Sequence, residues 1–265
     1  MIDAVSATLA KRGATAVVLG GSWARGDAHR ESDLDLWVFG LHSGDEILWR
    51  ERFMVTLRKT SEAAERRRLR NPPHVGGSVP GWKVAVPLWD PKGISRRLQS
   101  EARAFRWERI SDRCDRWVAE QTVGWAEEAV KLVRALASGH DATAAVQRDL
   151  LADHLGFLMA IHRRMFWDSE NEFWDRIGQR VGGAWALAQR KALGIPRAGL
   201  EPSCRAALSL YALTAGTVWG LLNPEQRAIA SNTCRVAGVP LSQELTSQPR
   251  GARTRDLRPD REPRT

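Results

Sequence analysis

The spacing of apolar residues along the chain changes near residue 94. Before this point, residues 15–19 form a short apolar run that stops at two glycines, and residues 34–39 alternate between polar and apolar side chains. Both patterns predict strands. The other elements expected here are a helix at residues 4–12, a charged helix at 61–70, a loop at 71–77, a third strand at 82–89 and a turn at 90–93. Pro87 favours an edge position for the third strand, and residues 46–59 fit neither period.

The rest of the chain has the apolar spacing of helices. We expect them at residues 112–136, 142–166, 170–193, 203–222 and 224–237. Several of the twelve tryptophans lie in this part, where core and inter-helix packing is a better reading than a base-stacking platform. The predicted fold class is therefore α+β, with an α/β domain containing a small mixed sheet at residues 1–95 and a helical bundle at residues 96–240.

Residues 241–265 are rich in Arg and Pro and contain almost nothing apolar. Little apolar surface is available there to offset the entropy of ordering the backbone. We therefore expect this segment to be a disordered tail.

Composition narrows the class of protein. The chain has 265 residues, 43% of them hydrophobic and 27% charged, and a formal net charge of +9. A basic balance of this size is compatible with phosphate-bearing ligands or nucleic acid. Three scattered cysteines argue against a disulfide framework. The start of the chain lacks the pattern of a signal peptide, and the uncharged run at 206–224 resembles a buried helix more than a membrane span. We expect a soluble, cytoplasmic protein.

The segment from Gly20 to Arg25 has the features of a phosphate-binding turn. The predicted strand runs into two glycines, which allow a sharp turn and a close approach of the backbone to a ligand. If a helix begins at Ser22, its free N–H groups face the turn and can bind phosphate oxygens. Arg25 adds a fork-shaped donor one turn later.

Asp33 and Asp35 are the carboxylates that follow this turn. They are two residues apart on a predicted strand and therefore lie on one face of it. Two adjacent carboxylates repel each other unless a cation neutralises them, and Mg²⁺ is the natural candidate beside phosphates. The plainer alternative is an ordinary glycine turn followed by a solvated strand end.

Together, the sequence GGSWARG, five further residues and SDLDLWVF resembles the signature of the DNA polymerase β-like nucleotidyltransferases. It is most similar to their small bacterial branch of antibiotic and aminoglycoside-type enzymes and minimal nucleotidyltransferases. The resemblance implies that Asp33 and Asp35 bind two Mg²⁺ ions and act in catalysis. It also implies nucleotide binding by Gly20, Gly21, Ser22, Arg25 and Ser32. The expected reaction transfers a nucleoside monophosphate, AMP from ATP, to a hydroxyl of a small molecule such as an antibiotic.

A third acid is the point where the chain departs from this family. The pattern places an acid on a later strand, near the position that Ala85 occupies here. Asp90 is the nearest carboxylate and is predicted as the third catalytic residue, the one that activates the acceptor hydroxyl. Asp90 also fits a second role, which is to start the turn at residues 90–93.

Three other clusters have both a functional and a structural interpretation. The acids at residues 168–175 fit a wall for a cationic acceptor, but a helix cap with first-turn acids is favoured. His154 and His162 lack metal-ligand spacing. The arginines at residues 66–68 fit RNA or phosphate, but a solvated helix face is favoured.

Two competing functions stay open. One is an antitoxin-type nucleotidyltransferase that modifies protein or RNA. The other is a degenerate, non-catalytic module that binds nucleotide or nucleic acid, which the missing acid near Ala85 and the basic tail favour. The expected partners of the leading hypothesis are a nucleoside triphosphate and a small hydroxyl acceptor; nucleic acid is not favoured and no membrane is expected. The sequence does not indicate an oligomeric state.

Overall fold

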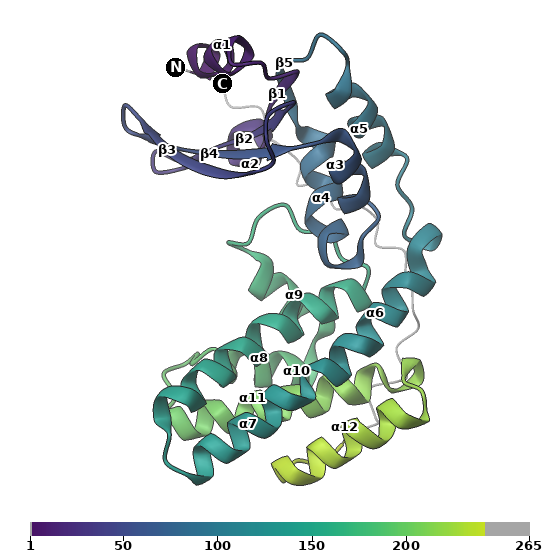
Figure 1. The fold of residues 1–265 in the computed structure, drawn as a ribbon. Coiled ribbons are helices and arrows are strands. Elements are labelled where there is room, and N and C mark those ends of the chain that lie inside the picture. The colour runs from purple at the N-terminus through teal and green to yellow at the C-terminus, as the bar shows by residue number, and fades with distance from the viewer. Residues whose placement is uncertain (1, 242–265) are drawn as a thin grey trace, which may run out of the picture.

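The computed structural model describes residues 2–241 and shows a sheet-containing part stacked on a bundle of helices (Figure 1). The strands are β1 (Ala16–Leu19), β2 (Leu34–Phe39), β3 (Gly44–Arg50), β4 (Phe53–Thr60) and β5 (Val86–Trp89). The α-helices before residue 105 are α1 (Ile2–Lys11), α2 (Gly21–Arg25), α3 (Glu62–Arg68), α4 (Pro72–Val84) and α5 (Ile94–Arg103). The α-helices of the bundle are α6 (Ser111–Gly124), α7 (Ala126–Ala137), α8 (Asp141–His162), α9 (Phe173–Val181), α10 (Gly183–Ala192), α11 (Leu200–Thr217) and α12 (Pro224–Ala237). This confirms the α+β class.

The sheet has five strands in the order β3-β4-β2-β1-β5. β2 and β4 are parallel, and the other neighbouring strands are antiparallel. The ambiguous residues 46–59 form most of the hairpin β3–β4, whose tip includes Glu51 at a φ of 55°. β5 is an edge strand, as Pro87 predicts.

The two faces of the sheet have different neighbours because side chains alternate along each strand. Val17, Leu36 and Leu57 belong to a small core with α1. Val18 and Phe39 point the other way and join the main core, which continues into the helical bundle. The second face also carries Asp35, so the carboxylates lie on the side of the sheet that faces the bundle.

Helix α4 corrects two sequence predictions. Residues 71–77, expected to be a loop, form its first turns, because Pro72 and Pro73 occupy the start of the helix, where a missing N–H costs nothing. A Cβ at Gly76 would overlap the ring of Trp167 from the bundle. The glycines that resembled loop residues therefore allow two helical segments to pack closely. The third strand is shorter than expected, because α4 extends to Val84.

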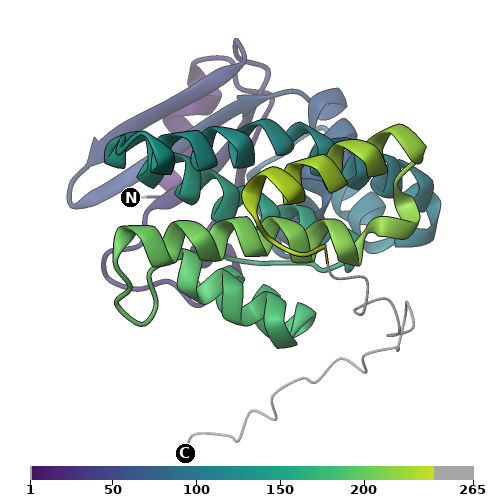
Figure 2. The same cartoon turned by 90° about the horizontal axis from the view of Figure 1, so that it is seen from below.

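The bundle also has more breaks than the apolar spacing predicts. The expected helix at 112–136 is two helices that meet at Trp125, and the one at 170–193 breaks at Gly182 and Gly183, which have φ values of 76° and 52°. Viewed from below, α7, α8, α11 and α12 form the body of the bundle (Figure 2). In residues 2–241, no helix has the length and apolar character that crossing a bilayer requires. The predicted tail lies almost wholly outside the described residues, and the boundary near residue 95 stays a prediction.

Candidate active site

The glycine turn and the first carboxylate strand are built against each other. β1 ends at Leu19, and the Gly20 N–H donates to the backbone oxygen of Asp35 over 2.8 Å. Gly21 has a φ of +60°, and a Cβ at this position would overlap the Asp35 carboxylate. Glycine is the residue that adopts this positive φ without strain and leaves room for the carboxylate. The turn and the carboxylate are therefore in direct contact.

Asp33 and Asp35 lie at the start of β2, on the same face. The Thr56 hydroxyl on the parallel strand β4 donates to Oδ2 of Asp33 over 3.4 Å. Burial raises the pKa of Asp35, and the neighbouring charge of Asp33 raises it further. Arg58 and Arg25 oppose this increase in pKa only in part. Because the pair carries negative charge that its surroundings do not fully neutralise, it is suited to bind a cation.

The predicted phosphate-binding residues surround the same turn. Ser22 lies in the first turn of the short helix α2 and is partly exposed. The Ser32 hydroxyl accepts from the His29 N–H over 2.8 Å, which orders the turn that leads to Asp33. Arg25 pairs with Asp27 over 3.1 Å and donates over 2.7 Å to the backbone oxygen of Asp168. Arg25 therefore connects the glycine turn to the loop after α8.

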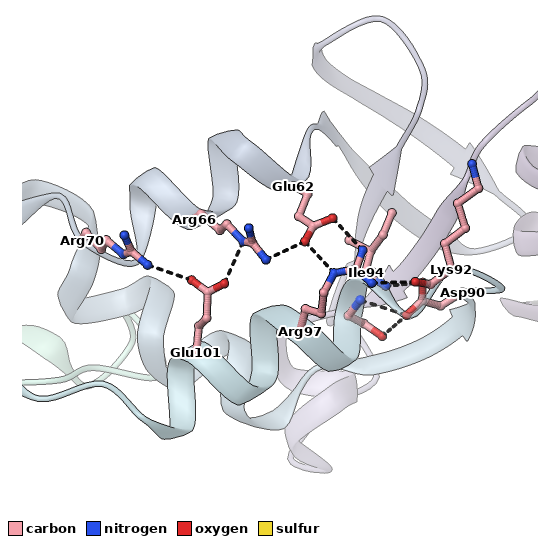
Figure 3. A network of polar contacts seen from close by, with 9 residues as sticks. Glu62, Arg66, Arg70, Asp90, Lys92, Ile94, Arg97 and Glu101 are labelled. Carbon is pink, nitrogen blue, oxygen red and sulfur yellow. Dashed lines mark hydrogen bonds and ion pairs between the residues drawn. The ribbon is translucent and has the colours of Figure 1, made fainter.

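The structure does not bring Asp90 to this group. β5 runs antiparallel to β1, with Leu19 opposite Val86 and Val17 opposite Trp89. The start of β5 therefore lies at the same end of the sheet as the carboxylates of β2, with β1 between the two strands, whereas Asp90 follows the opposite end of β5. Its Oδ1 accepts from the Ile94 N–H over 2.8 Å, and its Oδ2 from the Ser95 N–H over 2.9 Å and the Ser95 hydroxyl (Figure 3). These are the contacts of a residue that starts a turn and a helix. The catalytic role of Asp90 stays a prediction.

The neighbouring strand offers no acid in place of Asp90. In the parallel register, Asp35 lies opposite Thr56 and Trp37 lies opposite Arg58. Met54, Thr56 and Arg58 therefore occupy the same face of β4 as the carboxylate pair. In residues 2–241, no group of three or more His, Cys, Asp or Glu side chains is placed to hold a metal ion. Asp33 and Asp35 are the carboxylates that this face presents to a cation.

A cavity of about 450 Å³ reaches β2 at Trp37. Trp37, two residues after Asp35 on the same face of β2, forms one wall and stacks on Trp82 of α4 with ring centroids 4.4 Å apart. Helices α6 and α8 form the other side, and the charged side chains include Arg58 and Arg68. The cavity is not apparent from the sequence. A signal of it is the alternation of Val55 and Leu57 with Thr56 and Arg58, which identifies β4 as a strand with one polar face.

Two interpretations of the sequence can now be compared with the structure. Trp117, Trp125 and Trp167 line it, so several tryptophans serve a cavity wall as well as the core, whereas Trp185 is fully buried. In the acidic segment 168–175, helix α9 begins only at Phe173, after Glu172. The expected cap at Asp168 or Ser169 is therefore wrong, whereas Asp175 lies in the first turn of the helix, as expected.

Comparison with known proteins agrees with this geometry. Residues 3–100 match a family model described as a nucleotidyltransferase domain. These residues therefore form a nucleotidyltransferase domain, and transfer of nucleotidyl groups is the reaction class of the enzyme. Among solved structures, the chain is similar to a nucleotidyltransferase-like protein from Exiguobacterium sibiricum 255-15, with 12% identity, a TM-score of 0.43 and coverage of 90% of this chain and 77% of that one. No curated protein matches the sequence.

Proposed function

We propose that the protein is a Mg²⁺-dependent enzyme that transfers AMP from ATP to a hydroxyl group of a small molecule. The observation that carries this proposal is the contact between the Gly20-Gly21 turn and the Asp35 carboxylate. It places a turn suited to phosphate and a pair of carboxylates at one end of the sheet. Phosphoryl-group transfer needs mainly these two components, because the enzyme must position the triphosphate and neutralise charge as pyrophosphate leaves.

Asp33 and Asp35 would hold Mg²⁺. The donor set fits, because Mg²⁺ commonly takes one or two protein carboxylates and completes its shell with phosphate oxygens and water. The raised pKa of Asp35 fits as well, because burial and the charge of Asp33 cause it and a bound cation would relieve both effects. When bound, Mg²⁺ supplies charge neutralisation at the triphosphate. Two ions, the number that the family resemblance implies, remain part of the proposal.

The glycine turn would bind the triphosphate. Backbone N–H groups at Gly21 and Ser22, together with the Ser22 hydroxyl, would donate to phosphate oxygens. Arg25 and Ser32 belong to the same proposed site, Arg25 as a cation for the leaving pyrophosphate and Ser32 as the residue that orders the turn before Asp33. In the transfer, the acceptor oxygen bonds to the α-phosphorus while the bond from that phosphorus to the bridging oxygen breaks.

The hydroxyl proton needs a destination. Asp90 is the base that the sequence predicts, but its two carboxylate oxygens are bonded to the start of α5 at the other end of the sheet. Transfer of the proton to water in the half-exposed site is the simpler route. An Asp90→Asn variant tests the point, because a required base would lose most of its activity whereas a turn residue would keep it.

The experiment that tests the whole proposal is transfer of label from α-labelled ATP in the presence of Mg²⁺. The acceptors are a panel of hydroxyl-bearing antibiotics and other small molecules, RNA and cell-extract proteins. Transfer must disappear in Asp33→Asn/Asp35→Asn. The matched control is Glu127→Gln/Glu128→Gln, which also removes two negative charges, from the first turn of α7. Loss of transfer in both double variants would contradict the assignment of the metal site.

A non-catalytic nucleotide-binding module is the second candidate. The observation that favours it is the face of β4, where Met54, Thr56 and Arg58 offer no acid beside the pair. Binding of Mg²⁺-ATP without transfer to any acceptor would support this candidate. Label on RNA or protein alone would support the antitoxin-type alternative.

A further inference from the structure

The cavity beside the carboxylates combines flat apolar walls with positive charge. Trp37, Trp117, Trp125 and Trp167 are among its lining residues. Tryptophan faces bind planar rings through stacking and burial of apolar surface. A volume of about 450 Å³ lies within the usual range of small-molecule sites.

Its positive charge comes from Arg58 on β4 and Arg68 on α3, and His74 on α4 lies beside them. Desolvation lowers the pKa of Arg68, and the charge of Arg58 lowers it further. Desolvation also lowers the pKa of His74, with the two arginines next in effect. The two arginines are thus partly buried and close enough to repel each other, and His74 beside them is mainly neutral at neutral pH. The Nε of Arg68 is buried and has no hydrogen-bond partner.

The nearby surface arginines contrast with these. Arg97 donates to both oxygens of Glu62 at 2.8 Å, and Arg66 bridges Glu62 and Glu101 (Figure 3). In the part of the chain that the structure describes, neither Arg58 nor Arg68 has a carboxylate within 4.0 Å. The same small region therefore pairs its outer arginines with acids within 4.0 Å, whereas Glu65 and Asp45 act on Arg68 only through longer-range charge interactions.

The buried acid of the cavity does not neutralise them by direct contact. Glu65 is 1% exposed, accepts from the Thr60 hydroxyl over 3.0 Å and accepts from Nε1 of Trp82 over 3.1 Å. Both of its oxygens are thus occupied by neutral donors. Glu170, the other acid at the cavity, is exposed. A ligand anion would complete the hydrogen bonds of Arg68 that Glu65 does not.

We propose that this cavity is the acceptor site and that the acceptor is a small planar molecule carrying an anionic group, a carboxylate or a phosphate. The ring would lie against the tryptophans and the anion on Arg58, Arg68 and His74. The inference rests on the proposed function, because it places the acceptor hydroxyl on the Asp35 side of Trp37. It disfavours a polycationic aminoglycoside, which Arg58 and Arg68 would repel.

Binding of matched pairs of ligands tests the proposal. The probes are 4-hydroxybenzoate against 4-hydroxybenzamide, and pyridoxine 5′-phosphate against pyridoxine, so that each pair differs in its anionic group. Kanamycin is the polycationic probe. Affinity is measured by quenching of tryptophan fluorescence, with and without Mg²⁺ and an ATP analogue that cannot transfer AMP. We expect an anion to bind at least about tenfold more tightly than its neutral partner, and the better pair identifies carboxylate or phosphate.

Two variants separate the cavity from the surface. Arg68→Gln keeps a polar side chain and removes its charge, and should abolish the preference for the anion. Arg97→Gln removes a charge from the outer network and should leave the preference intact. Thermal unfolding of both variants verifies that they fold. Arg68→Lys should keep part of the preference for the anion if charge is the cause.

Several results would overturn the inference. These are equal binding of charged and neutral partners, tighter binding of kanamycin, an unchanged preference in Arg68→Gln, or displacement of the anion by the ATP analogue, which would make the cavity part of the nucleotide site. Binding of a short RNA in place of either small anion would overturn it as well. Failure of the proposed function is distinguishable, because it would appear as absence of Mg²⁺-dependent nucleotide binding through Asp33 and Asp35.

Discussion

Asp35 and Asp90 are the same type of residue at opposite ends of one sheet, and their surroundings differ. The oxygens of Asp90 accept two backbone N–H bonds and a hydroxyl bond from the start of α5. Asp35 is partly buried beside a second carboxylate, and its pKa is raised by this burial and by Asp33. One acid stabilises the fold, whereas the other is held in an unfavourable environment that a cation would relieve. An acid near a predicted site is therefore assigned by its partners and not by its position in the chain.

Replacing Asp35 should give the largest effect. We expect Asp35→Asn to lower the rate of transfer by about 10³-fold or more, because it removes a metal ligand and the charge that holds the cation. Its stability without Mg²⁺ should equal or exceed that of the wild type, because the unfavourable charge is gone. Single-turnover kinetics and thermal unfolding measure the two quantities. A variant with lower stability and normal transfer would instead make Asp35 a residue that stabilises the fold.

Gly21→Ala should separate the glycine turn from the carboxylate. The new Cβ would overlap the Asp35 carboxylate at a φ of +60°, so the turn must shift. We expect affinity for Mg²⁺-ATP to fall by about 10- to 100-fold and stability by about 1–3 kcal/mol. Titration calorimetry and chemical denaturation measure these changes. Gly13→Ala is the control, because a Cβ at that positive φ meets nothing within 4 Å, and it should lose stability only.

Asp90→Ala should lower the stability of the protein and leave its transfer activity almost unchanged. Loss of the contacts to the start of α5 should lower the free energy of unfolding by about 1 kcal/mol, as for other helix-start residues, with transfer kept within about twofold when the protein is folded. Denaturant unfolding measures the change in stability, and a transfer assay measures the change in activity. A stable but inactive variant would restore Asp90 to the catalytic site and remove the contrast with Asp35.

The smallest expected effect is in the pH dependence of stability. The pKa of Asp35 is raised in the folded protein, so without a metal the folded state holds its proton more tightly than the unfolded state does. Its contribution to stability is thus present below the unfolded pKa and is lost as the pH rises through the folded pKa. We expect the difference in Tm between wild type and Asp35→Asn to follow this change between about pH 4 and 7, and excess Mg²⁺ to reverse it. A difference independent of pH would contradict the desolvated state of Asp35.

The sequence was sufficient to predict the part of the site whose residues lie close together in the chain. Gly20, Gly21, Asp33 and Asp35 lie within sixteen residues on two adjacent strands, so period and turn chemistry place them together. Asp90 illustrates the limit, because the direction and register of β5 decide which end of the sheet it reaches. No local pattern carries that information.

Interactions between distant segments explain the other differences. Gly76 has the composition of a loop, but its missing side chain is required by Trp167, which follows about ninety residues later. The cavity brings together Arg58, Arg68 and Trp117 from a strand and two helices, so its walls exist only in the folded chain. Sequence periodicity predicts elements, and it does not predict which faces meet.

The contact between Gly76 and Trp167 joins helix α4 of the sheet-containing part to the segment that follows α8 of the bundle. The Trp167 N–H donates to the Gly76 backbone oxygen over 3.1 Å, and its ring fills the space that a side chain at 76 would take. A ligand that moves this ring must also move α4, which carries Trp82 under Trp37, two residues from Asp35. If filling of the cavity changes the affinity for metal-nucleotide through this contact, metal-nucleotide must change the affinity of the cavity for its ligand by the same factor.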